Sequence, residues 1–316
     1  NWTKEETDSA LEAYGKGQGF FLFRGIPLSF ASLSGGILDS LLEMGIPLRD
    51  GTKITMPEAL RLEKDKGEDE KKSSPLNEAL ESILSYEKIP LPEKGSVGLS
   101  LLRPYQKSAV KWMKALYACH LGGVLSDEMG LGKTLESIAF LSLVKEKSPI
   151  LVVAPKSVLY NWKSEFARFD PEREVLVLPT LQKEREEAIL GIENDKSKVI
   201  LTSYDSLRND VELYKGKRFS VLLLDEAQSI ANAFAKKSLA VKEIDASARF
   251  ALTGTPIQNS LLDLWSIFDF ILPGYFPPYA EFKATFGSNE FASEEKKRFL
   301  EKSISPFLLR RTKKEV

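Results

Sequence analysis

Two short segments of this chain combine residue types that suit phosphate chemistry. The first is Asp-Glu-Met-Gly-Leu-Gly-Lys-Thr at residues 127–134. Its glycines permit a tight loop whose backbone N–H groups can surround phosphate oxygens, while Lys133 supplies a positive charge and Thr134 a hydroxyl for magnesium. A helix that begins here would add its positive dipole end beneath the phosphates. We therefore predict a nucleotide-binding loop made of Met129, Gly130, Leu131, Gly132, Lys133 and Thr134.

The loop departs at one position from the generic pattern G-x-x-x-x-G-K-[ST], because Asp127 stands where that pattern has its first glycine. Taken alone, the segment also fits a glycine turn before an ordinary helix with a surface lysine. An apolar residue recurs at every third position after the loop, which predicts a helix with one buried stripe. These residues are Leu135, Ile138, Leu141 and Val144.

The second segment is Val-Leu-Leu-Leu-Asp-Glu-Ala-Gln at residues 221–228. Its apolar run predicts a buried parallel strand that delivers Asp225 and Glu226 to its carboxyl end, where open α/β sheets bind ligands. There Asp225 can hold magnesium, and Glu226 can orient or deprotonate an attacking water. By itself the segment also fits a strand followed by a solvated acidic turn. Because both segments occur in this order, we interpret Lys133, Asp225 and Glu226 as catalytic residues of a site for ATP and Mg²⁺.

Composition excludes several classes of protein. The chain has 316 residues, of which 43% are hydrophobic and 28% charged, which is typical of a globular protein of about two domains. No apolar run approaches the roughly 18 residues of a membrane span, and the start has no signal-peptide pattern. We therefore expect a cytoplasmic or nuclear protein that is neither secreted nor in contact with a membrane. Cys119 and His120 are the only cysteine and histidine, which leaves no partner for a disulfide or a Cys/His metal site.

The sequence predicts a domain boundary near residue 97. Residues 1–97 are net acidic and contain a charged stretch at 63–74, and a proline-containing segment at 89–95 is typical of a linker. Residues 98–316 are net basic, so any contact with a polyanion should favour that portion. We interpret residues 1–97 as a small mixed α+β accessory region, with helices at 4–14 and 33–44 and a strand at 19–23.

Beyond residue 97, six apolar segments alternate with mostly helical stretches. Strands that alternate with helices predict a parallel sheet covered on both faces, an α/β fold. One of the helices carries Leu159, Trp162 and Phe166 on a single face, so we interpret Trp162 as a core residue rather than a base-stacking platform. The predicted strands are 123–126, 150–154, 174–178, 199–202, 220–224 and 249–252.

Six ordered segments of residues 98–316 resemble successive motifs of the Swi/Snf helicase-like ATPases, the DNA-translocating proteins of chromatin remodellers and their bacterial relatives. They are LRPYQ (102–106), DEMGLGKT (127–134), VVAPKSVLYNW (152–162), LLLDEAQ (222–228), LTGTPIQN (252–259) and FLLRRTKKEV (307–316). The resemblance covers the first of that family's two RecA-like lobes and implies a P-loop fold. The family commonly has aspartate at the position of Asp127.

The resemblance also assigns residues that composition and spacing leave open. It implies that Gln106 recognises the adenine edge, since a side-chain amide donates and accepts in one plane. Without the resemblance, Gln106 is a polar residue at a helix start. A further implied partner is duplex DNA, contacted on its backbone without sequence preference. The residues implied in that contact are Lys156, Ser157, Thr202, Ser203, Thr253 and Thr255.

For these loops the residues alone give mixed indications. Lys156 and the free N–H groups where a strand gives way to a helix could hold a DNA phosphate. In contrast, Ser157 fits a helix cap, and Thr255 followed by Pro256 fits an ordinary turn.

The resemblance implies a DNA-dependent ATPase that couples Mg-ATP hydrolysis to movement along duplex DNA. Such hydrolysis also needs arginines from a second RecA-like lobe, and the loss of an arginine finger costs about 10³ to 10⁵ in rate. We therefore expect this chain alone to bind nucleotide but to hydrolyse it poorly. Two alternatives stay open: a lobe of a helicase that separates RNA or DNA strands, and a non-catalytic module whose residues 1–97 dock a protein partner.

Overall fold

The computed structural model describes residues 20–23, 26–29, 83–92, 97–192, 198–254, 261–287 and 294–316. The chain separates into two compact units, Asn1–Leu80 and Glu81–Val316, and the predicted boundary near residue 97 stays a prediction. In the first unit, β1 (Phe20–Phe23) pairs antiparallel with β2 (Ile26–Ser29). Strand β1 matches the predicted strand at 19–23. The predicted helices at 4–14 and 33–44 and the charged stretch at 63–74 lie outside the described residues.

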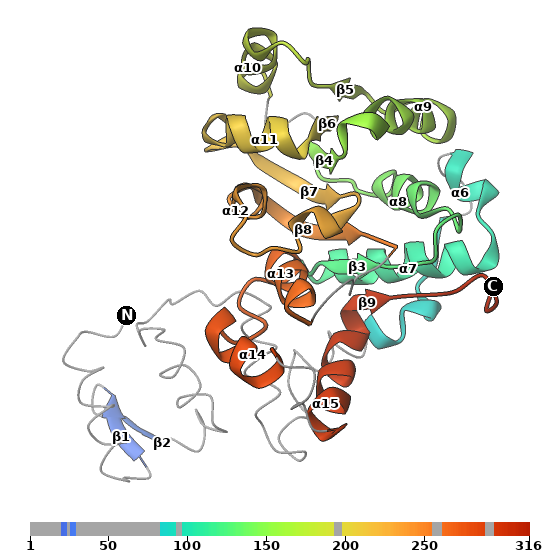
Figure 1. Ribbon diagram of the computed structural model, residues 1–316. Coiled ribbons are helices and arrows are strands. Elements are labelled where there is room, and N and C mark those ends of the chain that lie inside the picture. Colours follow the sequence, from blue (N-terminus) through green and yellow to red (C-terminus); the bar gives the residue numbers. More distant parts are fainter. Residues whose placement is uncertain are drawn as a thin grey trace. The chain divides into compact units, whose positions relative to one another are not determined.

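The second unit is built on a seven-stranded sheet in which every strand runs parallel to its neighbours, in the order β5-β6-β4-β7-β8-β3-β9 (Figure 1). Its strands are β3 (Gly123–Leu125), β4 (Ile150–Ala154), β5 (Val175–Val177), β6 (Val199–Ser203), β7 (Arg218–Leu224), β8 (Asp245–Leu252) and β9 (Leu308–Leu309). All six predicted strands are present, although β8 begins earlier than predicted. The two-residue strand β9 was not predicted.

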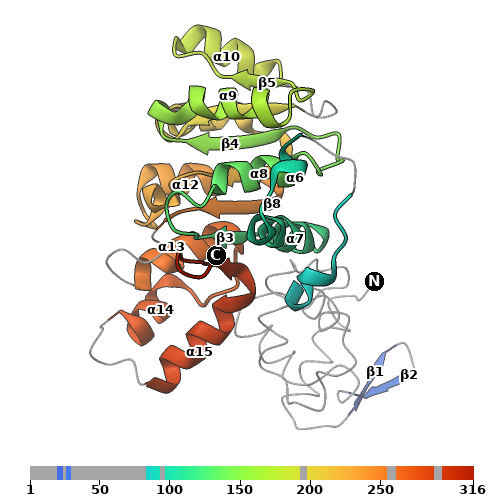
Figure 2. The same ribbon diagram turned by 90° about the vertical axis from the view of Figure 1, so that its right-hand side faces the viewer.

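Helices cover both faces of the sheet. On one face lie α7 (Pro104–Ala118), α8 (Lys133–Leu141) and α9 (Leu159–Phe169); on the other lie α11 (Tyr204–Asp210), α12 (Lys236–Lys242) and α13 (Leu261–Ile271) (Figures 1 and 2). The other helical elements are η2 (Tyr86–Lys88), α6 (Val97–Leu101), η3 (Lys156–Val158), α10 (Gln182–Leu190), η4 (Val211–Tyr214), η5 (Ala227–Ile230), α14 (Tyr279–Phe286), α15 (Glu294–Ile304) and η6 (Ser305–Phe307). The predicted α/β fold is therefore confirmed. Within the described part of the chain, each helix is too short or too polar to cross a bilayer.

The core explains why these segments form strands. Strands β4 and β7 lie inside the sheet with helices on both sides, so their residues form continuous apolar runs, and Val152 and Leu223 are fully buried. Leu159, Trp162 and Phe166 of α9 are buried together, as predicted from their spacing. Because all seven strands are parallel, their carboxyl ends share one edge of the sheet. The loops that follow β3, β4, β6, β7 and β8 therefore begin at the same edge.

One backbone position shows how closely the sheet is packed against its neighbours. A β-carbon on Gly122, directly before β3, would lie 2.0 Å from the carbonyl oxygen of Arg249 and 2.7 Å from that of Ile271. Both atoms belong to the backbone, so no side-chain rotation can relieve the overlap. Only glycine fits here without displacing a strand.

We predict that Gly122→Ala lowers the free energy of unfolding by about 1 to 3 kcal/mol or more, because the added methyl group must push backbone aside. Urea denaturation monitored by circular dichroism measures the change. Gly191→Ala is the matched control, since its β-carbon would meet its nearest atom at 3.4 Å and the site is exposed; we expect a change within about 0.5 kcal/mol. Equal stability of the two variants would contradict the packing described for Gly122.

Candidate active site

The predicted phosphate loop connects β3 to α8. Within it, Gly130 has φ 89° and Gly132 has φ 95°, in the left-handed region that favours glycine. Gly132 is also the residue before the first turn of α8, and a β-carbon on it would lie 2.5 Å from Nε2 of Gln106. The backbone angles favour glycine at both positions, and the close approach of Gln106 also favours it at Gly132. A tight phosphate loop and an ordinary glycine turn share these features, so the nucleotide-binding role stays a prediction.

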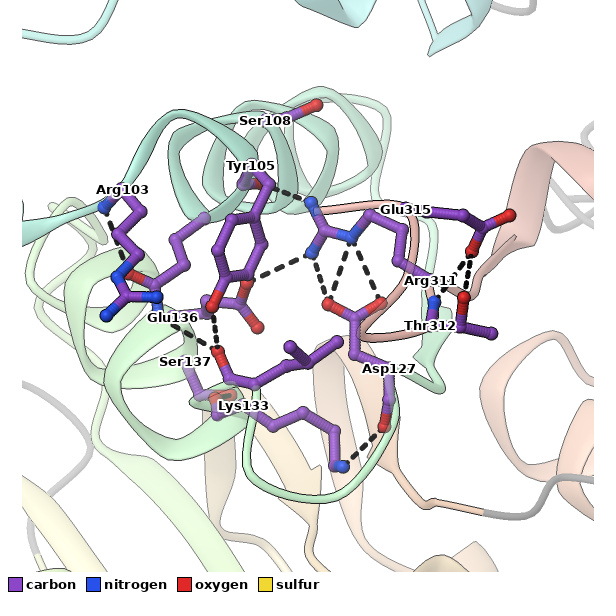
Figure 3. A network of polar contacts seen from close by, with 12 residues as sticks. Arg103, Tyr105, Ser108, Asp127, Lys133, Glu136, Ser137, Arg311, Thr312 and Glu315 are labelled. Carbon is purple, nitrogen blue, oxygen red and sulfur yellow. Dashed lines mark hydrogen bonds and ion pairs between the residues drawn. The ribbon is translucent and has the colours of Figure 1, made fainter.

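The polar groups at the amino-terminal end of α8 lie next to the loop. The first N–H groups of a helix have no partner within the helix, and they carry the positive end of its dipole. The ammonium of Lys133 donates a hydrogen bond to the backbone carbonyl of Asp127 at 2.6 Å (Figure 3). Thr134 is partly exposed next to it, Met129 is 70% exposed and Leu131 is buried. These donors suit the oxygens of a phosphate group.

Gln106 lies behind the loop rather than on an open surface. Its side chain is 6% exposed; Oε1 accepts a hydrogen bond from the backbone N–H of Arg103 at 3.0 Å, and Nε2 donates to the carbonyl of Leu131 at 3.0 Å. Tyr105 donates to the same carbonyl at 2.7 Å. The alternative that Gln106 is a polar residue at a helix start is confirmed, since it caps α7. Adenine recognition by Gln106 stays a prediction.

Asp225 follows β7 directly, at the carboxyl edge of the sheet. Its backbone N–H donates to the carbonyl of Val153 at 2.8 Å, which extends the pairing of β7 with β4 by one residue. Its Oδ2 accepts a hydrogen bond from the indole N–H of Trp162 at 2.8 Å, and its Oδ1 accepts from the backbone N–H of Glu226 at 2.9 Å. Burial raises the pKa of Asp225, while the hydrogen bond from Trp162 and the charge of Lys133 act in the opposite direction.

Trp162 therefore has two roles, of which the sequence predicted one. Its ring is 2% exposed in the core, as expected, but its N–H points to the carboxylate of Asp225. A buried indole N–H needs an acceptor, and that requirement was the available signal. The hydroxyl of Tyr204, also buried, donates to the carbonyl of Asp225 at 2.8 Å. These two aromatic residues fix the side chain and the backbone of the predicted magnesium ligand.

Glu226 has a left-handed backbone, with φ 50° and ψ 55°. For a residue with a β-carbon, this conformation costs about 1 to 3 kcal/mol, and such strain gathers at functional sites. Gln228 donates from Nε2 to Oε2 of Glu226 at 2.6 Å and accepts at Oε1 from the hydroxyl of Thr253 at 2.9 Å. Gln228 thus connects the predicted catalytic glutamate to the end of β8. No role for Gln228 was predicted from the sequence.

The residues implied in DNA contact differ in exposure. Lys156 and Ser157 are exposed in η3, directly after β4. The predicted cap role of Ser157 is wrong, because Val158 precedes the first turn of α9 and no side chain caps that helix. Thr255 lies outside the described residues.

The other three residues implied in DNA contact are buried. Thr202 and Thr253 are each 1% exposed, and Ser203 caps α11 by accepting from the N–H of Ser206 at 3.1 Å. Contact between these hydroxyls and DNA would first require their exposure. Their DNA roles stay predictions, and Lys156 and Ser157 are the better placed residues.

The donor set fits magnesium bound with a nucleotide. Mg²⁺ in such sites is held by one or two carboxylates together with substrate phosphates, rather than by a cage of protein ligands. Asp225 provides the carboxylate and Thr134 a hydroxyl at the same sheet edge. The described residues contain no group of three or more His, Cys, Asp or Glu side chains that could hold a metal by themselves.

Comparison with known proteins agrees with this geometry. The model of the SNF2-related domain matches residues 105–316. An uncharacterized ATP-dependent helicase of Mycoplasma genitalium is 41% identical over 219 residues, which cover 68% of this chain and 21% of that protein. The ISWI chromatin-remodeling complex ATPase ISW1 of Saccharomyces cerevisiae is 37% identical over 225 residues, which cover 68% of this chain and 20% of that protein.

A solved structure is also similar. The Sulfolobus solfataricus SWI2/SNF2 ATPase core in complex with dsDNA matches with a TM-score of 0.64 and 39% identity, over 71% of this chain and 47% of that chain. The present chain spans about a fifth of the length of the two curated relatives above. The sequence match agrees with the parallel sheet, whose carboxyl edge carries both the loop after β3 and Asp225 with Glu226 after β7, and the chain belongs to the SNF2-related family of helicase-like ATPases.

Proposed function

We propose that this chain is the ATP-binding lobe of a DNA-dependent ATPase that couples Mg-ATP hydrolysis to movement along duplex DNA. The observation that carries the proposal is the meeting of two segments at one sheet edge: the loop after β3 supplies Lys133, and the end of β7 supplies Asp225 and Glu226. Burial raises the pKa of the Asp225 carboxyl, and the charge of Lys133 acts against that rise. A second RecA-like lobe of the same protein completes the site in this proposal.

The side chains divide the work of hydrolysis. Lys133 and the first turn of α8 bind and orient the β- and γ-phosphates, where charge accumulates during transfer. Thr134 and Asp225 hold Mg²⁺, which when bound neutralises charge on the phosphate oxygens. Glu226 orients the attacking water and accepts its proton, and Gln228 holds the carboxylate of Glu226 in place.

Two substitutions separate nucleotide binding from hydrolysis. Lys133→Ala removes the cation in the phosphate loop, and we expect it to abolish binding of a fluorescent ATP analogue in the presence of Mg²⁺. Glu226→Gln keeps the shape of the side chain but removes the proton acceptor, so in the protein that also carries the second lobe binding persists while single-turnover hydrolysis falls by about 10² to 10⁴. Lys145→Ala, an exposed lysine upstream of β4, serves as the control for the lost charge. Unchanged hydrolysis in Glu226→Gln would remove Glu226 from the mechanism.

The indole of Trp162 offers a test of the magnesium site. Trp162→Phe keeps an aromatic ring in the core but deletes the N–H that holds Asp225, and loss of such a supporting partner typically costs 10- to 100-fold in metal affinity or activity. We expect the gain in ATP affinity that Mg²⁺ provides, measured against EDTA, to shrink about tenfold or more. Trp265→Phe is the matched control, since the buried indole of Trp265 also donates one hydrogen bond, to the carbonyl of Pro277 at 2.9 Å. A similar loss in both variants would point to general destabilisation.

The proposal includes duplex DNA as the partner because of two observations. Lys156 and Ser157 are exposed in η3 at the same sheet edge as the nucleotide site. The similar SWI2/SNF2 core of Sulfolobus solfataricus was solved in complex with dsDNA. A lysine and short hydroxyls can contact phosphates but offer no geometry for recognising base edges. DNA binding by this chain should therefore depend on charge and not on sequence.

We predict that the affinity for duplex DNA falls steeply with salt and does not vary with sequence. Because each phosphate contact contributes about 0.9 to the slope of log K against log salt, Lys156→Ala should flatten that slope by about 1. Lys147→Ala is the matched control, since Lys147 is exposed upstream of β4, at the opposite edge of the sheet. Fluorescence anisotropy with two unrelated duplexes and a single-stranded RNA gives the comparison. Preference for the RNA would favour a strand-separating helicase instead.

A further inference from the structure

The last described segment of the chain lies directly against the phosphate loop. Strand β9 pairs parallel with β3, with Val124 opposite Leu308 and Leu125 opposite Leu309. The pairing continues past the strands, because the N–H of Ser126 donates to the carbonyl of Leu309 at 2.7 Å and the N–H of Glu128 donates to that of Arg311 at 2.9 Å. The first half of the loop is therefore held by backbone hydrogen bonds to residues 309–311.

Arg311 adds a side-chain connection to the same loop (Figure 3). Its Nε donates to both carboxylate oxygens of Asp127, at 3.1 and 3.0 Å, and its Nη2 donates to Asp127 and, at 3.0 Å, to Glu136 of α8. Its Nη1 donates to the carbonyl of Tyr105, and its guanidinium lies 5.1 Å from the centre of the Tyr105 ring. We call Arg311 with Asp127, Glu136 and Tyr105 the Arg311 clamp.

Burial makes the clamp selective for arginine. The side chains of Asp127 and Glu136 are fully buried and that of Arg311 is 14% exposed, so little water is present to replace a lost contact. A planar guanidinium can donate to two carboxylates and a carbonyl at once, whereas the ammonium of lysine is a compact point charge without that fork. The clamp thus joins α7, the loop and α8 through one side chain.

Asp127 also touches the predicted catalytic lysine. Its carboxylate accepts from Arg311, while its backbone carbonyl accepts from Nζ of Lys133 at 2.6 Å. The backbone N–H of Lys313 donates to the carboxylate of Glu128 at 2.8 Å, and the ammonium of Lys313 lies 3.7 Å from the same carboxylate. A β-carbon on Gly130 would lie 3.6 Å from Cε of Lys313. Residues 309–313 therefore follow the loop from Ser126 to Gly130.

We propose that Arg311 is a positioning residue for nucleotide binding, which holds the phosphate loop in its binding geometry by fixing Asp127 beneath Lys133. The inference rests on the proposed ATP-binding function. A loop held in place before binding loses less freedom when the phosphates arrive, and misplacement of a binding group by about 1 Å can cost about 10²-fold. By thermodynamic linkage, bound Mg-ATP must in turn stabilise the contact between residues 308–313 and the loop.

The first experiment measures the affinity for a fluorescent ATP analogue with Mg²⁺, using the 316-residue chain well below its unfolding temperature. We expect Arg311→Gln to weaken binding about ten- to a hundredfold, and Arg311→Lys, which keeps the charge, to lie between that variant and the unaltered chain. Arg310→Gln is the matched control, because Arg310 is the adjacent arginine and is exposed; it should bind as the unaltered chain does. A purely structural role would lower the unfolding temperature but leave the affinity of the folded molecules unchanged.

A double-substitution cycle tests whether Arg311 acts through Asp127. If it does, Asp127→Asn combined with Arg311→Gln should bind no more weakly than Arg311→Gln alone. Additive losses would overturn the proposed route, and an unchanged affinity in folded Arg311→Gln would overturn the proposal itself. If Arg311→Gln does not fold, the affinity of Arg311→Lys for the ATP analogue decides in its place, and an unchanged affinity would overturn the proposal.

Hydrogen–deuterium exchange without nucleotide gives a readout that does not need ATP. Without nucleotide, Arg311→Gln should speed exchange of the amides at 126–134 and leave exchange of the β7 amides unchanged. In a second measurement, with nucleotide added, Mg-ATP should slow amide exchange at 308–313 in the unaltered chain. Equal exchange in the loop of Arg311→Gln and the unaltered chain would overturn the proposal. Failure of the unaltered chain to bind Mg-ATP would instead overturn the proposed function, and loop exchange would then still decide whether Arg311 holds the loop.

Discussion

A carboxylate buried away from water needs a cation, and Asp127 has one in Arg311, 184 residues further along the chain. Removing one partner of a buried ion pair typically costs about 3 to 5 kcal/mol, because the other charge is left without compensation. Burial, together with the charge of Asp127, raises the pKa of Glu136 to about 8, and Arg311 donates to both carboxyl groups. The phosphate loop and the last strand of the sheet are consequently stabilised by the same contact.

The remaining parts of the site are held by neutral donors at the same sheet edge. Asp225 is fixed by the N–H of Trp162 and by pairing with β4, and Glu226 is fixed by Gln228. Hydrogen bonds of this kind orient a carboxylate without neutralising it, which leaves its charge for a metal or a proton. Because Gln228 also accepts from Thr253 at the end of β8, the predicted catalytic glutamate is connected to two strands. Rigid strands thus set positions that flexible loops alone would not hold.

Local sequence patterns were sufficient to predict all but one strand of the sheet and the two segments, 127–134 and 221–228, that carry the candidate catalytic residues. Buried parallel strands are continuous apolar runs, so six of the seven could be predicted from a few neighbouring residues each, as could the single buried face of α9. Strand β9 has only two residues and forms because β3 offers it an open edge, which no local pattern records. For the same reason the sequence indicated hydroxyls at Thr202 and Thr253 but not their burial. The contacts of Trp162 and Gln106 depend on segments far along the chain.

Asp127 illustrates how a departure from a motif can be structural information. The generic pattern has glycine at this position, so an aspartate there is a departure from the motif. The resemblance to the family shows that its members commonly have aspartate here, but it gives no physical reason. The structure supplies a physical reason: the side chain is fully buried, and it is the acceptor for the guanidinium that joins residues 308–313 to the loop. A glycine at this position could not make that contact, and Arg311 would then face only the carboxyl of Glu136. Asp127 and Arg311 therefore act together as one buried ion pair, and the presence of each residue accounts for the presence of the other.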